Sequence, residues 1–277
     1  MNKAISILIT VHNRKQKTLR CLKDLYNQNV PSGYEIDIYL IDDGCTDGTP
    51  EAVAENFPQV NIIHADGNLF WNRGMHLAWK IAVDTKNYDA YIWLNDDTFI
   101  YKQSLNNMLL HYEETNKNAI IVAAISSSVN KKIVTYSGHK KGNKIYPNGK
   151  LQECDTMNGN FVLIPKIVFQ SIGNLDWSFR HAIGDLDYGY RARKAGFKIF
   201  VSSSFLATCE LNPQLPKWAR KDIPFKERIK NLYSPLGYAE PIPFFKYELR
   251  NFGLITAVKH FISIHIRVIF PILWKSH

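Results

Sequence analysis

Short apolar runs alternate with amphipathic stretches over about the first hundred residues. The apolar runs are rich in Ile, Val and Leu, which is typical of strands buried on both faces of a parallel sheet. These predicted strands are residues 5–11, 36–41, 60–64 and 88–94. The stretches between them have the spacing of helices, and they are residues 16–28, 49–56 and 73–84. The alternation predicts a doubly wound α/β fold.

After residue 119 the pattern changes to shorter strands separated by glycine-rich turns, which predicts a mixed, mostly parallel sheet flanked by helices. These strands are residues 120–124, 133–137 and 159–164. From Asn212 onward prolines recur, and we expect an extended, loop-rich tail before a final helix. The pattern therefore divides the chain into an α/β unit, residues 1–211, and a proline-rich, basic and amphipathic helical extension at the C-terminus, residues 212–277.

Composition narrows the class of protein. With 277 residues, 45% of them hydrophobic and 21% charged, the chain can bury one substantial core and is not expected to be disordered. Four widely spaced cysteines without a C-x-x-C pair argue against a zinc ribbon or a disulfide scaffold and suit a reducing cytosol. The first apolar run is too short for a signal peptide, so we expect no secretion.

The net charge of +9 is concentrated at one end of the chain. Residues 216–277 hold eleven Lys and Arg against four Asp and Glu, whereas the first 215 residues hold 23 basic and 21 acidic side chains. A polyanion would therefore bind the C-terminal quarter, and membrane phospholipid and nucleic acid are the candidates.

Polar clusters follow three of the predicted strands, at 10–13, 42–43 and 95–97. Ligands of doubly wound sheets bind beyond the carboxyl ends of the strands. The adjacent carboxylates of Asp96 and Asp97 repel each other unless a cation compensates them, and such oxygen ligands suit Mg²⁺ or Mn²⁺. The alternative is a turn or a helix N-cap, for which Asn-Asp-Asp-Thr is equally suitable.

Two further clusters have a structural and a functional interpretation. Residues 42–49 could form a tight turn and a cap, or offer a carboxylate to a nucleobase or ribose. No G-x-G-x-x-G or P-loop motif occurs, so a bound nucleotide would need a metal and side chains to hold its phosphates. Residues 184–191 lead into an Arg-rich helix that Gly196 ends, and their carboxylates could be helix caps or a general base.

Taken together, the order and spacing of these clusters resemble glycosyltransferase family 2, the inverting enzymes with the GT-A fold. The opening strand 5–14 is similar to the family's first strand, and 41–49 is similar to its D-D-G-S-T-D-G-T run. Residues 93–97 occupy its D-x-D position, 157–176 its acceptor-side strand and turn, and 184–196 its E-D-x-D-L-x-x-R-x-x-x-x-G element. The resemblance covers about residues 4–210 and points to bacterial surface-polysaccharide members that resemble rhamnosyltransferases.

The resemblance implies a GT-A catalytic domain in residues 1–211, with a nucleotide-binding half up to about residue 118 and an acceptor-binding half in 119–211. It implies a nucleoside-diphosphate sugar donor, a glycan or lipid-linked acceptor in cell-surface polysaccharide biosynthesis, and Mn²⁺ or Mg²⁺ as cofactor. Asp97 would bind the metal, and Asp185 would be the catalytic base. The implied nucleotide and donor contacts are Thr10, Asn13, Asp43, Asn68, Arg73, Gly74, Asn95 and Asp96.

The sequence departs from the family pattern at three positions. Cys45 replaces a serine, Asn95 stands where the first D-x-D carboxylate is usual, and Gly184 stands where a glutamate precedes the base. Metal affinity would then rest mainly on Asp97. If the register slips at the last motif, Asp187 could be the base in place of Asp185.

Four other residues have open roles. Trp71 could stack on a sugar or be a core aromatic. His139, His181 and Cys209 lie in the acceptor half and could be ligands or structural residues.

The final helix, residues 252–274, is apolar but interrupted by Lys259, His260, His265 and Arg267, so we expect it not to span a membrane. Its wide apolar face and narrow basic edge predict a helix that lies at an anionic membrane surface. We therefore expect a cytoplasmic protein at the inner face of the cytoplasmic membrane. The alternative is a helix packed on the protein's own core or on a second copy in a homodimer.

The sequence leaves three alternatives to glycosyl transfer. A nucleic-acid-binding protein is not expected, because the basic tail is interspersed with prolines and contains no recognisable reading motif. A catalytically silent scaffold on the same fold is the second alternative. A metal-dependent nucleotidyltransferase is the third, although residues 12–15 offer only a weak phosphate-binding loop.

Overall fold

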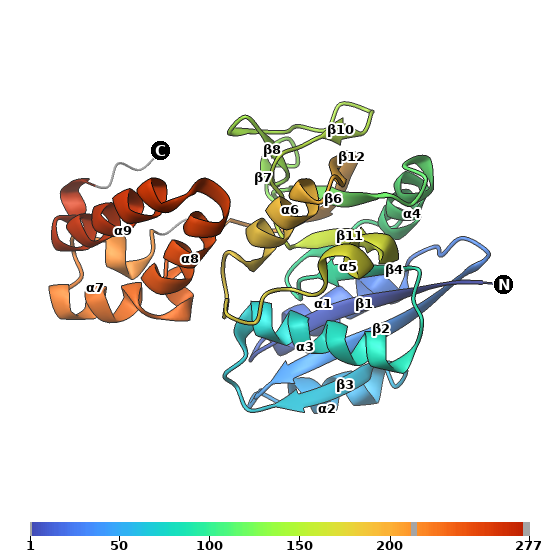
Figure 1. Ribbon diagram of the computed structural model, residues 1–277. Helices are drawn as coiled ribbons and strands as arrows, with labels where there is room; N and C mark the ends of the chain where they lie inside the picture. Colours follow the sequence, from blue (N-terminus) through green and yellow to red (C-terminus); the bar gives the residue numbers. More distant parts are fainter. Residues whose placement is uncertain (1, 212–214, 274–277) are drawn as a thin grey trace.

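The computed structural model describes residues 2–211 and 215–273 and shows a twisted sheet with helices on both faces (Figure 1). The main path of the sheet runs β3-β2-β1-β4-β11-β6-β12-β10. Strands β1, β2, β3 and β4 pair in parallel, as do β6 and β12, whereas β11 is antiparallel to both of its neighbours. The predicted mixed, mostly parallel sheet is therefore confirmed.

The first half of the chain alternates strands and helices in the predicted order. Its elements are β1 (Lys3–Val11), α1 (Lys15–Tyr26), β2 (Tyr34–Asp43), α2 (Thr49–Asn56), β3 (Asn61–Ala65), α3 (Phe70–Thr85), β4 (Ala90–Leu94), β5 (Phe99–Ile100) and α4 (Ser104–Glu114). The second half holds the shorter strands and two more helices. These are β6 (Ala119–Ser126), β7 (Val134–Tyr136), β8 (His139–Lys140), β9 (Asn143–Lys144), β10 (Gln152–Glu153), β11 (Phe161–Pro165), α5 (Lys166–Ile172), α6 (Gly184–Lys194) and β12 (Lys198–Thr208).

Two apolar layers hold the helices on the sheet. Helices α1, α2 and α4 bury their apolar residues against one face, and α3, α5 and α6 bury theirs against the other. Every residue of β4 and β6 is buried, which explains why these strands are continuous apolar runs without polar alternation.

Strand register brings the loops of the predicted site to one edge of the sheet. β1 lies between β2 and β4, with Val11 opposite Asp42. Because β11 is antiparallel to β4, its first residue, Phe161, lies opposite Leu94 at the end of β4. The carboxyl ends of β1, β2 and β4 and the amino end of β11 therefore form a single rim.

The C-terminal extension is helical, which confirms that part of the predicted fold class and corrects only the expectation of a loop-rich stretch before a single final helix. It contains η1 (Lys217–Ala219), α7 (Phe225–Leu232), η2 (Pro235–Gly237), α8 (Pro241–Phe252), α9 (Leu254–Ile269) and η3 (Pro271–Leu273). Pro235 and Pro241 occupy the first turns of η2 and α8, and Pro224 caps α7. A proline at a helix start loses no hydrogen bond, so here these residues begin helices rather than prevent them.

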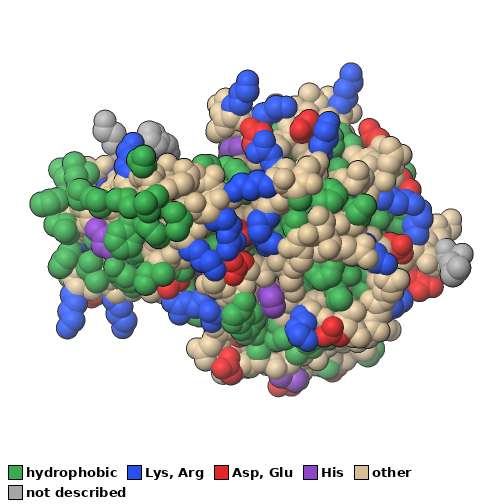
Figure 2. All heavy atoms as spheres, in the orientation of Figure 1, with side chains coloured by type: hydrophobic (Ala, Val, Ile, Leu, Met, Phe, Trp, Pro, Cys, Tyr) green, Lys and Arg blue, Asp and Glu red, His purple; other side chains and the backbone are tan. Residues whose placement is uncertain are grey.

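The extension lies beyond the carboxyl ends of the strands (Figure 1). It has a small core of its own around Trp218, Leu232 and Val268. The predicted final helix, residues 252–274, corresponds to α9, which begins only after Gly253 (φ of +89°) and ends at Ile269. Trp274 lies outside the described residues. Within residues 2–211 and 215–273, none of the helices combines the length and the hydropathy that a membrane span requires. Figure 2 shows hydrophobic side chains gathered over the part of the surface formed by α9.

Candidate functional site

Arg14, directly after β1, links the two adjacent carboxylates that follow β4. Its guanidinium donates to Asp96 Oδ1 at 3.1 Å and to Asp97 Oδ2 at 2.9 Å. Thr18 donates to the other oxygen of Asp96. Burial, together with the charge of Asp97, raises the pKa of Asp96 to about 6 against the opposing effects of Arg14 and Thr18. The two carboxylates therefore form an anionic site that already binds the Arg14 guanidinium.

These residues fit a divalent metal only if it is shared with a substrate. Within the described part of the chain, no group of three or more His, Cys, Asp or Glu side chains could hold a metal ion. Asp97 is partly exposed and Asp96 is buried, so the protein offers one or two carboxylate ligands at this rim. Mg²⁺ and similar ions commonly bind in this way, through one or two carboxylates together with substrate phosphates and water.

Asp43, at the end of β2, fixes the chain at the start of α3. Its Oδ1 accepts from the backbone N–H of Leu69 at 3.1 Å, and its Oδ2 accepts from that of Phe70 at 2.8 Å. Each carboxylate oxygen retains a second lone pair, so the predicted contact with a nucleobase stays open. His12 Nδ1 lies 2.6 Å from the carbonyl oxygen of Asp43, which joins the β1 and β2 loops.

Three other predicted nucleotide contacts lie at the carboxyl end of β1 or pack against it. Asn13 has a φ of +50°, and its side-chain oxygen accepts from the backbone N–H of Thr46 at 2.8 Å. Thr10 Oγ1 is buried and has no hydrogen-bond partner among the described residues. The Thr10 side chain lies against Gly74, where an added Cβ would come within 2.6 Å of that oxygen. Gly74 is thus required by close packing between β1 and α3.

A chain of hydrogen bonds connects the D-x-D position with the predicted base. The Asn95 backbone N–H donates to the carbonyl of Asn160 at 2.9 Å, and the N–H of the adjacent Gly159 donates to Asp185 Oδ2 at 2.8 Å. Asn95 Oδ1 accepts from the Trp71 indole at 2.7 Å. Asp185 therefore lies on the same rim as Asp96 and Asp97, although the motifs are far apart in sequence.

The two candidate bases on α6 have different surroundings. Asp187 is fully buried and paired with Arg191 at 2.9 Å and with Arg250 at 2.8 Å. Asp185 has no cationic partner among its recorded contacts within residues 2–211 and 215–273, and it accepts only backbone N–H bonds from Leu186 and Gly159. Desolvation raises the pKa of Asp185, which those bonds oppose. A carboxylate with a raised pKa and no cationic partner can accept a proton, whereas Asp187 is committed to its ion pairs.

The departure at Gly184 has a steric cause. A Cβ at this position would lie 1.7 Å from Asn72 Oδ1. Asn72 is buried on α3 and its Nδ2 donates to the carbonyls of Asp176 and Phe179, each at 2.8 Å. In this chain Asn72 occupies the space that a side chain at residue 184 would need.

Two predicted donor contacts, Arg73 and Asn68, have no contact with the carboxylates of the rim among the bonds of the described residues. Arg73 Nε donates to the carbonyl of Trp177 at 2.9 Å, and its guanidinium lies 5.0 Å from the centre of that ring. Asn68 is exposed at the turn before α3, and its backbone N–H donates to Asp66. Both residues border the site, but their roles toward a nucleotide stay predictions.

Sequence reasoning did not identify Arg14 or Tyr238 as site residues. The only signal for Arg14 was the basic His-Asn-Arg-Lys run after β1. Tyr238 belongs to the extension and contacts His181, at 5.5 Å between ring centres. Cys209, left open by the sequence, lies 3.9 Å from Asp97 Oδ1. His139 pairs with β9 and Thr156, in the segment between β7 and β10.

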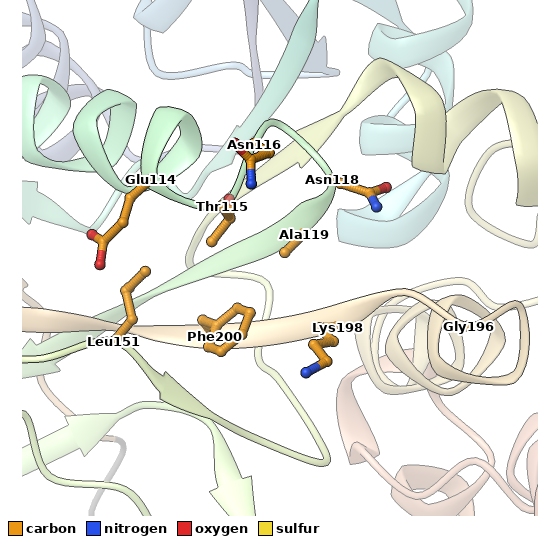
Figure 3. Close-up of a pocket in the computed structure, with 9 residues that line it drawn as sticks. All are labelled: Glu114, Thr115, Asn116, Asn118, Ala119, Leu151, Gly196, Lys198 and Phe200. Atoms are coloured by element: carbon orange, nitrogen blue, oxygen red, sulfur yellow. The ribbon is translucent and has the colours of Figure 1, made fainter.

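A hollow of about 420 Å³, whose lining residues Figure 3 shows, lies at the opposite edge of the sheet from the rim. It opens between the end of α4 and the first residues of β6 and β12, and Glu114, Ala119 and Lys198 are among the residues that line it. It contains the amino ends of parallel strands and none of the carboxylates of the rim. The rim at the carboxyl ends is therefore the candidate site.

Comparison with known proteins agrees with this geometry. The sequence profile of glycosyl transferase family 2 matches residues 6–173, which is more than half of the chain. The low-salt glycan biosynthesis hexosyltransferase Agl10 of Haloferax volcanii is 24% identical over 148 residues, which are 50% of this chain and 48% of Agl10. The chain thus aligns with only about half the length of this relative.

Solved structures share the fold at low sequence identity. S. aureus TarS has a TM-score of 0.61 at 13% identity, with 95% of this chain and 49% of TarS covered. The mannosyltransferase PcManGT of Pyrobaculum calidifontis, solved with GDP-Man and Mn²⁺, has a TM-score of 0.57 at 13% identity. The match covers 96% of this chain and 76% of PcManGT. The sheet, its carboxylate rim and the family match lead to one conclusion: this chain belongs to glycosyl transferase family 2 and has the GT-A fold of those glycosyltransferases.

Proposed function

We propose that the protein transfers a sugar from a nucleoside-diphosphate sugar to a hydroxyl group of a glycan or lipid-linked acceptor in cell-surface polysaccharide biosynthesis. The acceptor oxygen attacks C1 of the sugar while the bond from C1 to the diphosphate breaks. Asp185 takes the proton of the hydroxyl, and the nucleoside diphosphate leaves from the opposite face. The anomeric centre is inverted.

The observation that carries this proposal is the placement of two kinds of carboxylate on one rim. Asp185 lacks a cationic partner in the described structure and has a raised pKa, which suits a base. Asp96 and Asp97 already attract a guanidinium, which suits a cation and an anionic leaving group. The hydrogen bonds through Asn160 and Gly159 hold these two groups in a fixed relation.

We further propose that Asp97 holds Mn²⁺ or Mg²⁺ together with the donor diphosphate, with Asp96 beside it. The ion would supply positive charge to the leaving diphosphate. PcManGT was solved with Mn²⁺ and GDP-Man, and TarS was solved with UDP, which supports a metal and a nucleotide at this kind of site. Asp43 and Asn13 are the proposed nucleoside contacts.

Thermal shift against UDP, GDP and dTDP, each with and without Mn²⁺, tests the donor site. Binding to the folded state raises the melting temperature by mass action. We expect one nucleotide to give a metal-dependent shift that Asp97→Ala abolishes. Asp84→Ala is the matched control, because Asp84 lies on the exposed side of α3, paired only with Lys80 within the described contacts. No shift with any nucleotide would contradict the proposal and favour a silent scaffold.

Product analysis separates glycosyl transfer from the nearest enzymatic alternative. Incubation with a sugar nucleotide should release the nucleoside diphosphate if the chain is a glycosyltransferase. A nucleotidyltransferase would instead form or consume pyrophosphate. Release of pyrophosphate would therefore overturn the proposal.

We also propose that α9 attaches the protein to the inner face of an anionic cytoplasmic membrane. A stripe of β-branched residues faces away from the rest of the extension, and we call it the outer stripe: Ile255, Val258, Ile262, Ile266 and Ile269. All five are exposed, and Ile255 is 87% exposed. Lys259 lies next to the outer stripe on the same helix. An apolar face with a basic edge is the pattern of helices that bind at a lipid surface.

A further inference from the structure

Ion pairs anchor the extension to the segment that carries the predicted base. Arg250 of α8 donates to both oxygens of Asp187, at 2.9 and 2.8 Å, and to Asp176 at 2.6 Å. At the start of the same helix, Glu240 pairs with Arg180. Because Asp187 is buried, these contacts fix α8 and the turn before it relative to α6.

That turn places an aromatic ring from the extension beside the rim. The ring centre of Tyr238 lies 5.5 Å from that of His181, which lies 6.3 Å from that of Phe70. The three rings come from three separate segments: the start of α3, the loop before α6 and the end of η2. We call Phe70, His181 and Tyr238 the aromatic wall. Tyr238 is 53% exposed, so its ring offers free surface toward solvent.

The backbone around the aromatic wall is strained. Phe70 has a φ of +57°, Tyr238 of +61° and Ile183, two residues after His181, of +79°. Residues other than glycine rarely adopt such angles, and β-branched or bulky residues least of all. Strained conformations of this kind persist only where the surrounding structure holds them, and they are concentrated at ligand sites.

The charges near the aromatic wall favour an uncharged ligand group. Burial and the charge of Arg14 lower the pKa of His181 to about 4, so this ring is neutral at pH 7. The buried Nδ1 of His181 has no hydrogen-bond partner in the described structure, so packing holds the ring. A neutral aromatic surface suits the apolar C–H face of a sugar ring, and the nearby Arg14 cation suits the diphosphate attached to it.

We propose that Phe70, His181 and Tyr238 bind a pyranose ring, with Tyr238 supplied to the site by the C-terminal extension. This inference rests on the proposed glycosyl transfer. The ring packs against the aromatic wall through its C–H face, and its hydroxyls remain available to polar groups such as the Tyr238 phenol. The sugar is either that of the donor or that of the acceptor, because the proposed reaction brings both sugars to the same rim.

The test uses the full chain with three substitutions. Tyr238→Asn removes the ring but tolerates the left-handed backbone, since asparagine adopts positive φ more readily than most residues. Tyr238→Phe keeps the ring. Tyr233→Ala is the matched control, because Tyr233 is an exposed tyrosine of the same extension that contacts His265. Calorimetry compares UDP, GDP and dTDP with UDP-glucose, UDP-N-acetylglucosamine, GDP-mannose and dTDP-rhamnose.

Two results support the inference and identify the sugar. If the aromatic wall holds the donor sugar, Tyr238→Asn weakens binding of the intact sugar nucleotide about tenfold and leaves binding of the free nucleoside diphosphate unchanged. Tyr238→Phe, which keeps the ring, then binds the sugar nucleotide like the parent. If the wall holds the acceptor sugar, hydrolysis of the sugar nucleotide is unchanged, but the KM for methyl glycosides as acceptors rises about tenfold.

Two results overturn it. If Tyr238→Asn weakened binding of the free nucleoside diphosphate as much as binding of the sugar nucleotide, Tyr238 would lie at the phosphates instead. Behaviour of Tyr238→Asn identical to that of Tyr233→Ala in every assay would remove it from the site. Failure of the parent chain itself to bind any of the nucleotides is a separate outcome, which refutes the glycosyl-transfer proposal and the aromatic wall with it.

Discussion

Asp96 shows how a single buried carboxylate links the site to stability. Its folded-state pKa of about 6 lies above the ordinary 3.8, so the ligand-free folded state binds this proton more tightly than the unfolded chain does. The contribution of protonated Asp96 to the free energy of unfolding is therefore fully present below about pH 4 and is lost as the pH rises through about 6. Above that pH the charged side chain destabilises the ligand-free protein, and a bound cation would relieve the effect.

We predict that Asp96→Asn becomes more stable than the parent as the pH rises from 4 to 7, by up to about 3 kcal/mol. Urea denaturation at a series of pH values, without metal or nucleotide, measures the difference in the free energy of unfolding. The exposed Asp84→Asn serves as control. Parallel pH profiles for Asp96→Asn and the parent would show that burial does not raise this pKa.

Gly184 and Asn72 are packed so closely that the stability effect of a substitution at one should depend on the other. We predict that Gly184→Ala destabilises the parent by about 1–3 kcal/mol, because the new Cβ overlaps Asn72 Oδ1. In an Asn72→Ala background the same substitution should cost much less. A double-mutant cycle of unfolding free energies measures the coupling. Equal costs in both backgrounds would mean that the Asn72 side chain moves aside easily.

At the scale of elements, helix α6 carries two carboxylates with separate tasks. We predict that Asp185→Asn lowers kcat by about 10²–10⁴ with little change in stability, since it removes a base that has no ion pair in the described structure. Asp187→Asn should instead lower the unfolding free energy by about 3–5 kcal/mol, because it leaves Arg191 and Arg250 without their shared buried partner. Sugar-nucleotide turnover and thermal melting distinguish the two. Full activity in Asp185→Asn would exclude it as the base.

The sequence predicted best those elements whose burial is uniform. β4 and β6 were recognisable because strands covered on both faces consist of unbroken apolar residues, and β1 is buried almost as continuously. β12 was not predicted although it is long, because its middle holds three consecutive serines and its pairing with β6 is irregular there. Ser202 takes part in that irregular pairing, with its hydroxyl accepting from Ala124 N–H. Only tertiary structure supplies such a partner.

The candidate site was predictable only where one motif forms it. The carboxylates of Asp43, Asp97 and Asp185 stand in contiguous motifs, and the resemblance of those motifs to the family's implied their roles. Arg14 and Tyr238 could not be found in this way, since their importance comes from contacts across the sheet edge and across the junction with the extension. The choice between Asp185 and Asp187 likewise depended on Arg250, which lies 63 residues after Asp187.

At the scale of the whole molecule, the extension joins the site to a surface. Its inner side is fixed to the α/β unit by Arg250 and Glu240, close to the predicted base. Its outer side presents the outer stripe of α9, and hydrophobic side chains cover much of that end of the molecule (Figure 2). A lipid-linked acceptor held at a membrane would then lie at a fixed distance from the rim. The geometry gives a reason for one chain to contain both units.

This arrangement predicts binding to anionic vesicles through the outer stripe. Vesicles with about 30% phosphatidylglycerol should retain the parent protein in a flotation assay more strongly than pure phosphatidylcholine, because basic residues near the surface attract anionic lipid. Ile262→Glu combined with Ile266→Glu should reduce binding at least about tenfold, since it places charges on the lipid-facing side. Both positions are exposed, so the fold should tolerate the change. Leu110→Glu, at an exposed leucine of α4, is the matched control.

The same variants decide between a membrane and a second copy of the chain as the partner of α9. Analytical ultracentrifugation without vesicles should give the same mass for the parent and the double variant if the outer stripe faces lipid. A parent dimer that becomes a monomer in the double variant, without vesicle binding by either, would contradict the membrane proposal. In that case the outer stripe would be a helix–helix interface, because Ile255, Ile262 and Ile269 recur every seven residues as in the seam of a coiled coil.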